Sequence, residues 1–193
     1  CEKVLDLEPQ NAMAYVGKLM VDLKVRTQQN LADCAEPFDK NGNYSKAMRF
    51  ADGSLKQFMD DALLTIRNRI LEGKYLAAYA LMEKAATEKQ LQAVINILQG
   101  IGEYKDSLVL ISRCEETMKA LFAEGKYQEA IKKAENAITT QEFLEGIRLL
   151  EELGDYKDAP SLKLEYEKRW ATRQEIANKV WKAYREINDK FVA

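Results

Sequence analysis

A 52-residue unit that occurs twice in succession constrains this chain more than any other feature of its sequence. Glu72-Gly73-Lys74-Tyr75 recurs as Glu124-Gly125-Lys126-Tyr127. Gly102-Glu103-Tyr104-Lys105-Asp106 recurs as Gly154-Asp155-Tyr156-Lys157-Asp158 at the same offset. Sliding one copy onto the other without a gap aligns 16 identical residues among 52. Self-similarity at a fixed period is the signature of repeat architectures, so we expect a protein built from similar structural units.

The residues between these motifs predict that the units are helical. Long stretches of Leu, Ala, Glu, Lys and Gln are interrupted by only nine glycines and three prolines in 193 residues. These five residue types favour helices. No run alternates cleanly between apolar and polar residues as a half-buried strand would. The predicted fold class is therefore all-α.

Each copy is predicted to contain three helices. In the second copy they run from Tyr127 to Ile138, from about Thr139 to Glu151, and onward from Tyr156. The first copy shows the same pattern 52 residues earlier. Between the second and third helices, Gly102 and Gly154 can adopt the positive φ that ends a helix. We expect each unit to end in a tight, glycine-centred turn followed by a new helix.

The remainder of the chain is predicted to be a diverged form of the same architecture. Asn43-Tyr44-Ser45-Lys46-Ala47 is similar to the start of the third helix of a copy, and Asp52-Gly53-Ser54 is the expected place for a break. We expect a single α-solenoid domain over residues 1–193. Its expected divisions are an N-terminal part (1–42), a diverged unit (43–71), repeat 1 (72–123), repeat 2 (124–175) and the remainder of a long terminal helix (176–193).

Two segments resemble tetratricopeptide repeats. In the stretch from Leu5 to Tyr15 a helix ends at Pro9 and an Asn-Ala-x-Ala-Tyr pattern opens the next, as at the junction between two such repeats. Residues 124–138 resemble the second helix of a repeat. The resemblance covers most of residues 1–160 and implies a right-handed superhelix of helical hairpins that binds proteins. It implies no catalytic residue.

The departures from that family are also informative. The usual period is 34 residues, so a 52-residue unit predicts about one additional helix, and the first-helix Trp and Leu-Gly signature is absent. The Tyr-Lys-Asp-Ser/Ala turn is similar to one in uncharacterised bacterial multidomain proteins. This similarity implies an interaction module of a larger bacterial protein. The first residue, Cys1, also indicates a processed form or an excised segment.

The composition argues against most catalytic chemistry. The chain contains no histidine, which removes Ser–His and Cys–His nucleophile pairs and most zinc sites. No glycine-rich phosphate loop is present. Cys34 and Cys114 are expected to be small buried apolar residues rather than reactive thiols. We therefore expect no catalytic, metal or cofactor site, and no cofactor; an enzyme of unknown type is a third alternative.

Charge and cysteine content indicate the class of partner and the cellular compartment. A net charge of −2 gives no attraction for nucleic acid, and no apolar run approaches the ~20 residues of a membrane span. An odd count of three cysteines without framework spacing favours a reducing compartment, so we expect a cytoplasmic protein. The alternative is attachment to the cell envelope, for example through a lipidated Cys1 or through segments outside this chain.

The C-terminal segment offers a candidate surface. From Trp170 to Phe191 the chain is predicted to form one long helix whose apolar stripe is flanked by basic residues. The stripe contains Trp170, Ile176, Ala177, Val180, Trp181, Tyr184, Ile187 and Phe191. One interpretation is a capping helix whose stripe packs on the last repeat. The other is that the part around Trp181 and Tyr184 binds a partner, because Trp, Tyr and Arg are enriched in interface hot spots.

The tyrosines of the repeated turns allow a similar pair of interpretations. Tyr104 and Tyr156 either line a shared surface or pack against the preceding helix. The candidate partner-binding residues are therefore Trp170, Arg173, Trp181, Tyr184, Tyr104 and Tyr156. We expect a non-catalytic module that binds another protein or peptide; the alternative is a structural spacer with no dedicated groove.

Overall fold

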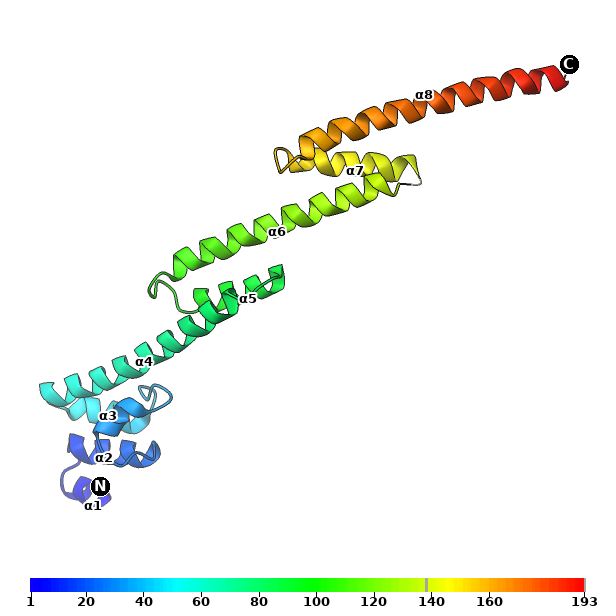
Figure 1. Ribbon diagram of the computed structural model, residues 1–193. Coiled ribbons are helices and arrows are strands. Elements are labelled where there is room, and N and C mark those ends of the chain that lie inside the picture. The colour runs from blue at the N-terminus through cyan, green and yellow to red at the C-terminus, as the bar shows by residue number, and fades with distance from the viewer. Residues whose placement is uncertain (138, 193) are drawn as a thin grey trace. The chain divides into compact units, whose positions relative to one another are not determined.

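The computed structural model describes residues 1–137 and 139–192, with side chains described up to 188 in the last helix. In that part of the chain all regular structure is helical (Figure 1), which confirms the predicted all-α class. The elements in chain order are α1 (Glu2–Leu7), α2 (Ala12–Asp22), the 3₁₀-helix η1 (Gln29–Asp33), α3 (Gly42–Phe50), α4 (Gly53–Met82), α5 (Glu88–Gln99), α6 (Ser107–Glu135), α7 (Thr140–Leu153) and α8 (Ala159–Val192).

The chain forms two compact units, each with its own contacts. The N-terminal unit comprises Cys1–Ala86 and Gln90–Ser112, and the C-terminal unit comprises Thr87–Lys89 and Arg113–Ala193. Among the described residues, no helix is both long enough and apolar enough to cross a lipid bilayer.

Side-chain caps define where the N-terminal helices begin. Asn11 accepts a hydrogen bond from the Ala14 backbone N–H at 3.0 Å and so caps α2 directly after Pro9. Asp52 accepts one from the Leu55 backbone N–H at 2.8 Å and caps α4. Such caps satisfy backbone donors that a helix start leaves unpaired. The predicted break at Asp52-Gly53-Ser54 is thus confirmed, as is the helix–proline turn–helix geometry around Pro9.

The core of the N-terminal unit lies between α2, η1, α3 and the first half of α4. Leu19 of α2, Leu31 of η1, and Met59 and Ile66 of α4 are fully buried there. Full burial of a large apolar side chain contributes about 1.5–3 kcal/mol relative to exposure. This cluster therefore fixes the first half of α4.

The structure corrects the predicted number of helices per unit. The helices expected to start at Tyr75 and Tyr127 do not start there, because α4 and α6 run without interruption through Gly73 and Gly125. The third helix of one copy and the first helix of the next are thus a single long helix, and the predicted additional helix is not present. A glycine inside a helix costs only about 1 kcal/mol relative to alanine, which strong helix formers on both sides readily offset.

The helix starts after the repeated turns also differ slightly from the prediction. Helices α6 and α8 begin at Ser107 and Ala159, three residues after the predicted starts at Tyr104 and Tyr156. Gly102 and Gly154 have φ values of 61° and 56°, which confirms the predicted positive φ. Gly154 is the C-cap of α7, and Gly102 lies in the turn after α5. Lys105 and Lys157 also have positive φ, a conformation that costs a non-glycine residue of the order of 1–3 kcal/mol.

The core of the C-terminal unit lies between α6, α7 and the first half of α8. Ala130 and Ala134 of α6 face α7, where Gly146 lets the two backbones approach closely. Thr139 and Glu142 form a reciprocal capping box at the start of α7. The long C-terminal helix predicted from Trp170 to Phe191 is confirmed as part of α8.

Candidate functional site

Helix α8 carries four of the six predicted partner-binding residues, and its first half is supported by α7. Trp170 stacks on Phe143 of α7, with ring centroids 5.6 Å apart and 25° between the planes. Tyr166 meets the same ring edge to face at 6.1 Å. The guanidinium carbon of Arg173 lies 5.6 Å from the Phe143 ring centroid. Phe143 therefore supports α8 as far as Arg173.

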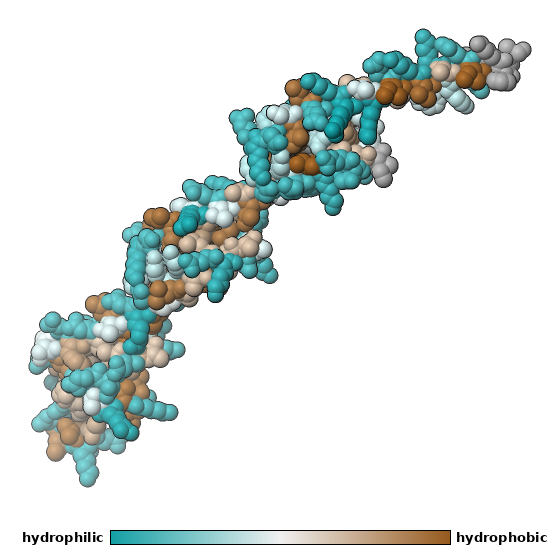
Figure 2. Space-filling view, viewed as in Figure 1, coloured by the Kyte–Doolittle hydropathy of each residue, from teal (hydrophilic) through white to brown (hydrophobic). Residues whose placement is uncertain are grey.

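Beyond Arg173 the apolar stripe of α8 is uncovered. The exposed fractions of Val180, Trp181 and Tyr184 are 62%, 61% and 59%. Ile176 and Ile187 are exposed as well, and all residues from 171 to 188 are exposed in the described structure. Figure 2 shows apolar side chains along one side of α8 toward its C-terminal end. Large apolar residues on consecutive turns form a patch of the kind that marks interaction sites.

The two interpretations of this stripe apply to different halves of α8. Trp170 and Arg173 lie together at the Phe143 contact, as a capping helix requires. Trp181 and Tyr184 lie together further along, with ring centroids 5.8 Å apart and perpendicular planes, and cover no described core. Phe191, the last member of the predicted stripe, lies outside the residues whose side chains are described. The distal half is therefore the part of α8 that is open to a partner.

A shallow groove lies where α8 leaves α7. Its volume is about 430 Å³, and Phe143 is its aromatic lining residue. Lys168, Arg169 and Arg173 line it on the α8 side. Arg169 forms an ion pair with Glu165 at 2.8 Å. The groove thus joins the supported half of α8 to the exposed stripe through basic side chains.

Tyr156 forms part of a polar cluster inside the C-terminal unit. Its hydroxyl donates to Oε2 of Glu124 at 2.8 Å, and Nζ of Lys157 bonds to the same oxygen at 2.5 Å. Tyr127 donates its hydroxyl to Asp158. The two tyrosine rings meet edge to face at 6.0 Å, and the Lys157 ammonium lies over both. These contacts tie the turn before α8 to α6 and hold Lys157 at its positive φ.

The electrostatics of this cluster indicate a structural role. Hydrogen bonds from Lys157, Gln128 and Tyr156 lower the pKa of Glu124 to about 2. The hydrogen bond to Asp158 raises the pKa of Tyr127 to about 12. A general acid or base works best with a pKa near the operating pH. Neither Glu124 nor Tyr127 meets that condition at neutral pH.

Tyr104 occupies the equivalent position in the N-terminal unit. Its hydroxyl donates to Glu72 at 2.8 Å, Lys105 pairs with Glu72 at 2.5 Å, and Tyr75 donates to Asp106 at 2.6 Å. Each contact repeats one in the C-terminal unit at an offset of 52 residues. The hydroxyl groups of both turn tyrosines thus bond to the long helix that precedes the short one.

The sequence carries a signal for this pairing. The Glu-Gly-Lys-Tyr and Tyr-Lys-Asp motifs are duplicated together at one offset, as contacting segments would be. The two motifs can make contact because α4 is continuous and therefore places Glu72 and Tyr75 one helical turn apart.

Tyr156 lies at the opposite end of α8 from Trp181, roughly 35 Å away along a helix at 1.5 Å per residue. Tyr156 and the stripe are therefore separate features.

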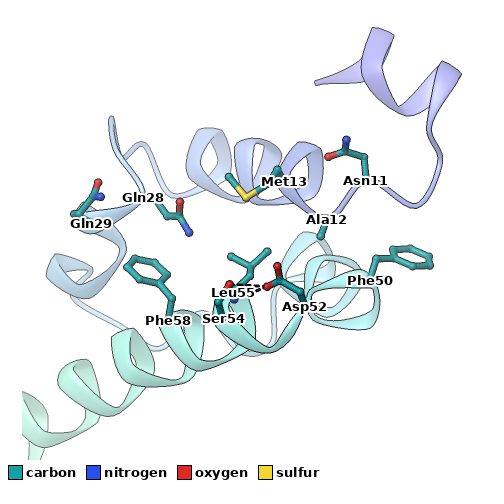
Figure 3. Close-up of a pocket in the computed structure, with 10 residues that line it drawn as sticks. All are labelled: Asn11, Ala12, Met13, Gln28, Gln29, Phe50, Asp52, Ser54, Leu55 and Phe58. Atoms are coloured by element: carbon teal, nitrogen blue, oxygen red, sulfur yellow. Dashed lines mark hydrogen bonds between the residues drawn. The ribbon is translucent and has the colours of Figure 1, made fainter.

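A second groove lies in the N-terminal unit between the start of α2 and the junction of α3 with α4 (Figure 3). Its volume is about 500 Å³. Figure 3 shows Phe58 and Leu55 of α4 directed toward it, and Gln28 entering from the other side. Two of its polar residues, Asn11 and Asp52, are already engaged as helix caps. None of the predicted partner-binding residues lines this groove.

The remaining side chains offer few reactive groups. Within the described residues, no cluster of three or more Cys, Asp or Glu side chains is arranged to hold a metal ion. Burial raises the pKa of the Cys34 and Cys114 thiols, which disfavours the reactive thiolate.

No protein-family model matches this chain, and no curated protein or solved structure matches it significantly. Function must therefore be inferred from the residues of the chain itself.

Proposed function

We propose that this chain is a non-catalytic protein–protein interaction module and that the distal half of α8 carries its binding surface. The surface, called here the distal face, consists of Arg173, Ile176, Ala177, Val180, Trp181, Tyr184 and Ile187. The observation that carries the proposal is the exposure of its five large apolar side chains on consecutive turns of one helix. Most helical stability in proteins comes from packing of such a face, and the five large apolar side chains of this one are all exposed.

The chemistry of the distal face also favours a protein partner. Trp, Tyr and Arg are the residue types most enriched in interface hot spots. A hot spot is a residue whose truncation to alanine costs about 2 kcal/mol or more of binding energy. Trp181 and Tyr184 already contact each other, so they present one aromatic surface. Arg173 adds a charged group at the edge that is anchored on Phe143.

A capture experiment with the whole chain as bait tests this proposal. Wild-type protein is compared with the double variant Trp181→Ala/Tyr184→Ala and with Leu164→Ala. Leu164 is a matched control because it is an exposed apolar residue of α8 that lies in the supported half, outside the distal face. We expect the wild type and Leu164→Ala to retain the same partner and the double variant to lose it. Capture that is identical for all three proteins would contradict the proposal.

A structural spacer is the second candidate, and one observation favours it. The two equivalent clusters around Tyr104 and Tyr156 tie the turns of both units to the long helices through the tyrosine hydroxyl groups. A spacer needs such rigid turns but no partner. The same capture experiment separates the candidates, because a spacer enriches no protein through the distal face.

Further features of the proposal rest on the sequence motifs. The proline junction near Pro9 and the Glu124–Ile131 pattern support a tetratricopeptide-like class, from which we propose a right-handed α-solenoid acting as a scaffold within a larger bacterial protein. The odd count of three cysteines without framework spacing supports a cytoplasmic location over the cell envelope.

A further inference from the structure

We infer that the element of the partner that binds the distal half of α8 is a short amphipathic helix of the same type as α5 and α7. This inference rests on the proposed function and specifies the chemistry of the partner. Two observations carry it. The distal half of α8 contains a diverged copy of the segment on which α6 packs its short helix, and this copy continues the interface of α8 with α7.

The repeated segment occurs three times, once in each long helix. Residues 74–79 of α4 read Lys-Tyr-Leu-Ala-Ala-Tyr, residues 126–131 of α6 read Lys-Tyr-Gln-Glu-Ala-Ile, and residues 179–184 of α8 read Lys-Val-Trp-Lys-Ala-Tyr. In all three, lysine is followed by an aromatic or aliphatic residue, and the alanine three positions later is followed by another. The residue four positions after that alanine is apolar in each copy: Met82, Ala134 and Ile187.

In α6 this segment is the surface on which α7 packs. A Cβ added at Gly146 of α7 would lie 2.9 Å from the carbonyl oxygen of Ala130 and 2.9 Å from the backbone nitrogen of Ala134. The two helix backbones are therefore in close contact there. Tyr127, Ala130 and Ala134 are buried as a result, with exposed fractions of 8%, 0% and 4%.

The N-terminal unit shows the same burial pattern 52 residues earlier. Ala78 of α4 is fully buried, and Tyr75 and Met82 on the same side are half-buried. Each buried residue of α5 corresponds, at an offset of 52, to a buried residue of α7. The pairs are Leu91 with Phe143, Val94 with Gly146, Ile95 with Ile147, and Leu98 with Leu150. Both short helices thus have one buried face with the spacing i, i+3, i+4, i+7, which defines an amphipathic helix.

The corresponding positions of α8 are exposed. The exposed fractions of Val180 and Ile187 are 62% and 57%, and Ala183 between them is exposed as well. The copies in α4 and α6 are buried within their units, whereas the copy in α8 remains available. A helix with the buried face of α5 or α7 has the shape and chemistry that such a segment accepts.

The exposed copy also continues the interface that α8 forms with α7. Ala159 and Tyr166, which are buried in the core of the C-terminal unit, precede Arg173, Val180 and Ile187 at intervals of seven residues. Seven residues make almost two helical turns, so these five residues follow one side of α8. Contact with α7 on this side ends at Arg173, and a second short helix would cover the next part.

The copy in α8 differs from the other two in its rotation about the helix. It lies 53 residues after the copy in α6, whereas α6 and α8 begin 52 residues apart. One residue corresponds to about 100° around a helix. The bound helix would therefore lie on a different side of α8 than α7 does on α6, so the inference concerns the contact itself and not the direction of the repeat.

A fusion of the whole chain to one additional short helix tests the inference. A second copy of residues 139–153, which contain α7 and its capping box, follows residue 193 after a flexible Gly/Ser linker of about 12 residues. Such a linker presents the helix at a millimolar effective concentration. The control fusion carries Phe143→Gln, Ile147→Gln and Leu150→Gln in the appended copy alone. Hydrogen exchange measured by mass spectrometry reports the protection of the backbone amides of residues 176–188.

We expect these amides to exchange at least tenfold more slowly in the fusion than in the control fusion. Ala183→Leu should abolish the difference although it adds apolar area, because the larger side chain occupies the point where the helices approach most closely. Leucine favours a helix almost as much as alanine does, so α8 itself should be retained. The matched substitution Ala171→Leu, at an exposed position of α8 outside the distal face, should leave the protection unchanged.

Equal exchange in the two fusions would overturn the inference, as would protection that survives Ala183→Leu. Partner capture that still depends on Trp181 and Tyr184 would then leave the proposed function intact, whereas capture that ignores both residues would overturn it too. A dimer of the unfused wild type that Ala183→Leu abolishes in sedimentation equilibrium would assign the surface to a second copy. Binding to phosphatidylglycerol vesicles that Trp181→Ala/Tyr184→Ala abolishes would assign it to lipid. Either result overturns the inference.

Discussion

Three glycine-to-alanine substitutions should change stability in opposite directions, and the structure gives the sign at each position. Gly73 and Gly125 lie inside α4 and α6, where an added Cβ would meet no atom within 4 Å. Gly146 lies on the face of α7 that contacts α6. There a Cβ would lie 2.9 Å from both the carbonyl oxygen of Ala130 and the backbone nitrogen of Ala134. The alanine methyl group would thus meet no neighbouring atom at positions 73 and 125, but it would clash with the α6 backbone at position 146.

The magnitudes follow from two competing terms. Gly73→Ala and Gly125→Ala should each raise the free energy of unfolding by about 0.5–1 kcal/mol, because alanine loses less conformational freedom in a helix. Gly146→Ala gains the same stabilisation of about 0.5–1 kcal/mol from the smaller loss of conformational freedom. Its Cβ, however, meets backbone atoms that cannot rotate away, so α6 and α7 must separate, at a cost of roughly 1–3 kcal/mol. The expected net effect at Gly146 is a loss of up to roughly 2.5 kcal/mol.

Urea unfolding followed by far-UV circular dichroism measures these differences. The dependence on urea concentration should be the same for all variants, so that midpoints report stability directly. Destabilisation by Gly125→Ala would refute the continuous helix α6, because it would require a backbone conformation at Gly125 that alanine disfavours. No loss in Gly146→Ala would refute the close contact of α6 with α7.

Three further predictions follow from the polar contacts. The Tyr127 hydroxyl is stabilised in its protonated form, with its pKa raised from 10.0 to about 12. Its contribution should therefore be complete below pH 10 and disappear toward pH 12, so the stability difference between wild type and Tyr127→Phe in chemical denaturation should shrink over that range. Glu124 is stabilised in its ionised form, with its pKa lowered from 4.5 to about 2. The difference between wild type and Glu124→Gln should be complete above pH 4.5 and vanish as the pH falls toward 2; a difference independent of pH would contradict the assigned hydrogen bonds. Thr139→Ala removes the capping box of α7 and should cost about 1 kcal/mol; Thr117→Ala, on exposed α6, is the control that should change stability by less than about 0.5 kcal/mol.

Local signals in the sequence predicted much of the fold. Asn11, Asp52 and Thr139 are residue types that cap helices, and each does so at or next to its predicted helix boundary. Gly102 and Gly154 adopt positive φ as expected. These features depend on a few neighbouring residues, so that sequence alone carries the information.

The errors arose where the outcome depends on contacts distant in sequence. Helix starts were predicted at Tyr75 and Tyr127, but the flanking helix formers and the contacts of these two tyrosines with the next turn favour continuation. The bonds from Tyr104 to Glu72 and from Tyr156 to Glu124 join residues 32 positions apart. Spacing alone could not assign those partners.

The candidate surface was predicted in part for the same reason. Periodicity identified the apolar stripe of α8, and the residue types Trp181 and Tyr184 suggested a binding role. Where the stripe changes from covered to exposed depends on how far α7 extends and on the position of Phe143. The residues of the stripe alone do not show where its coverage by α7 ends.

Photo-cross-linking inside cells tests most directly whether the distal face binds a partner. A benzophenone analogue of phenylalanine replaces Trp181 in one protein and Leu164, an exposed residue in the supported half of α8, in another. The account predicts a discrete cross-linked product from position 181 and none from position 164 after irradiation. No product from position 181, or the same product from both positions, would contradict it.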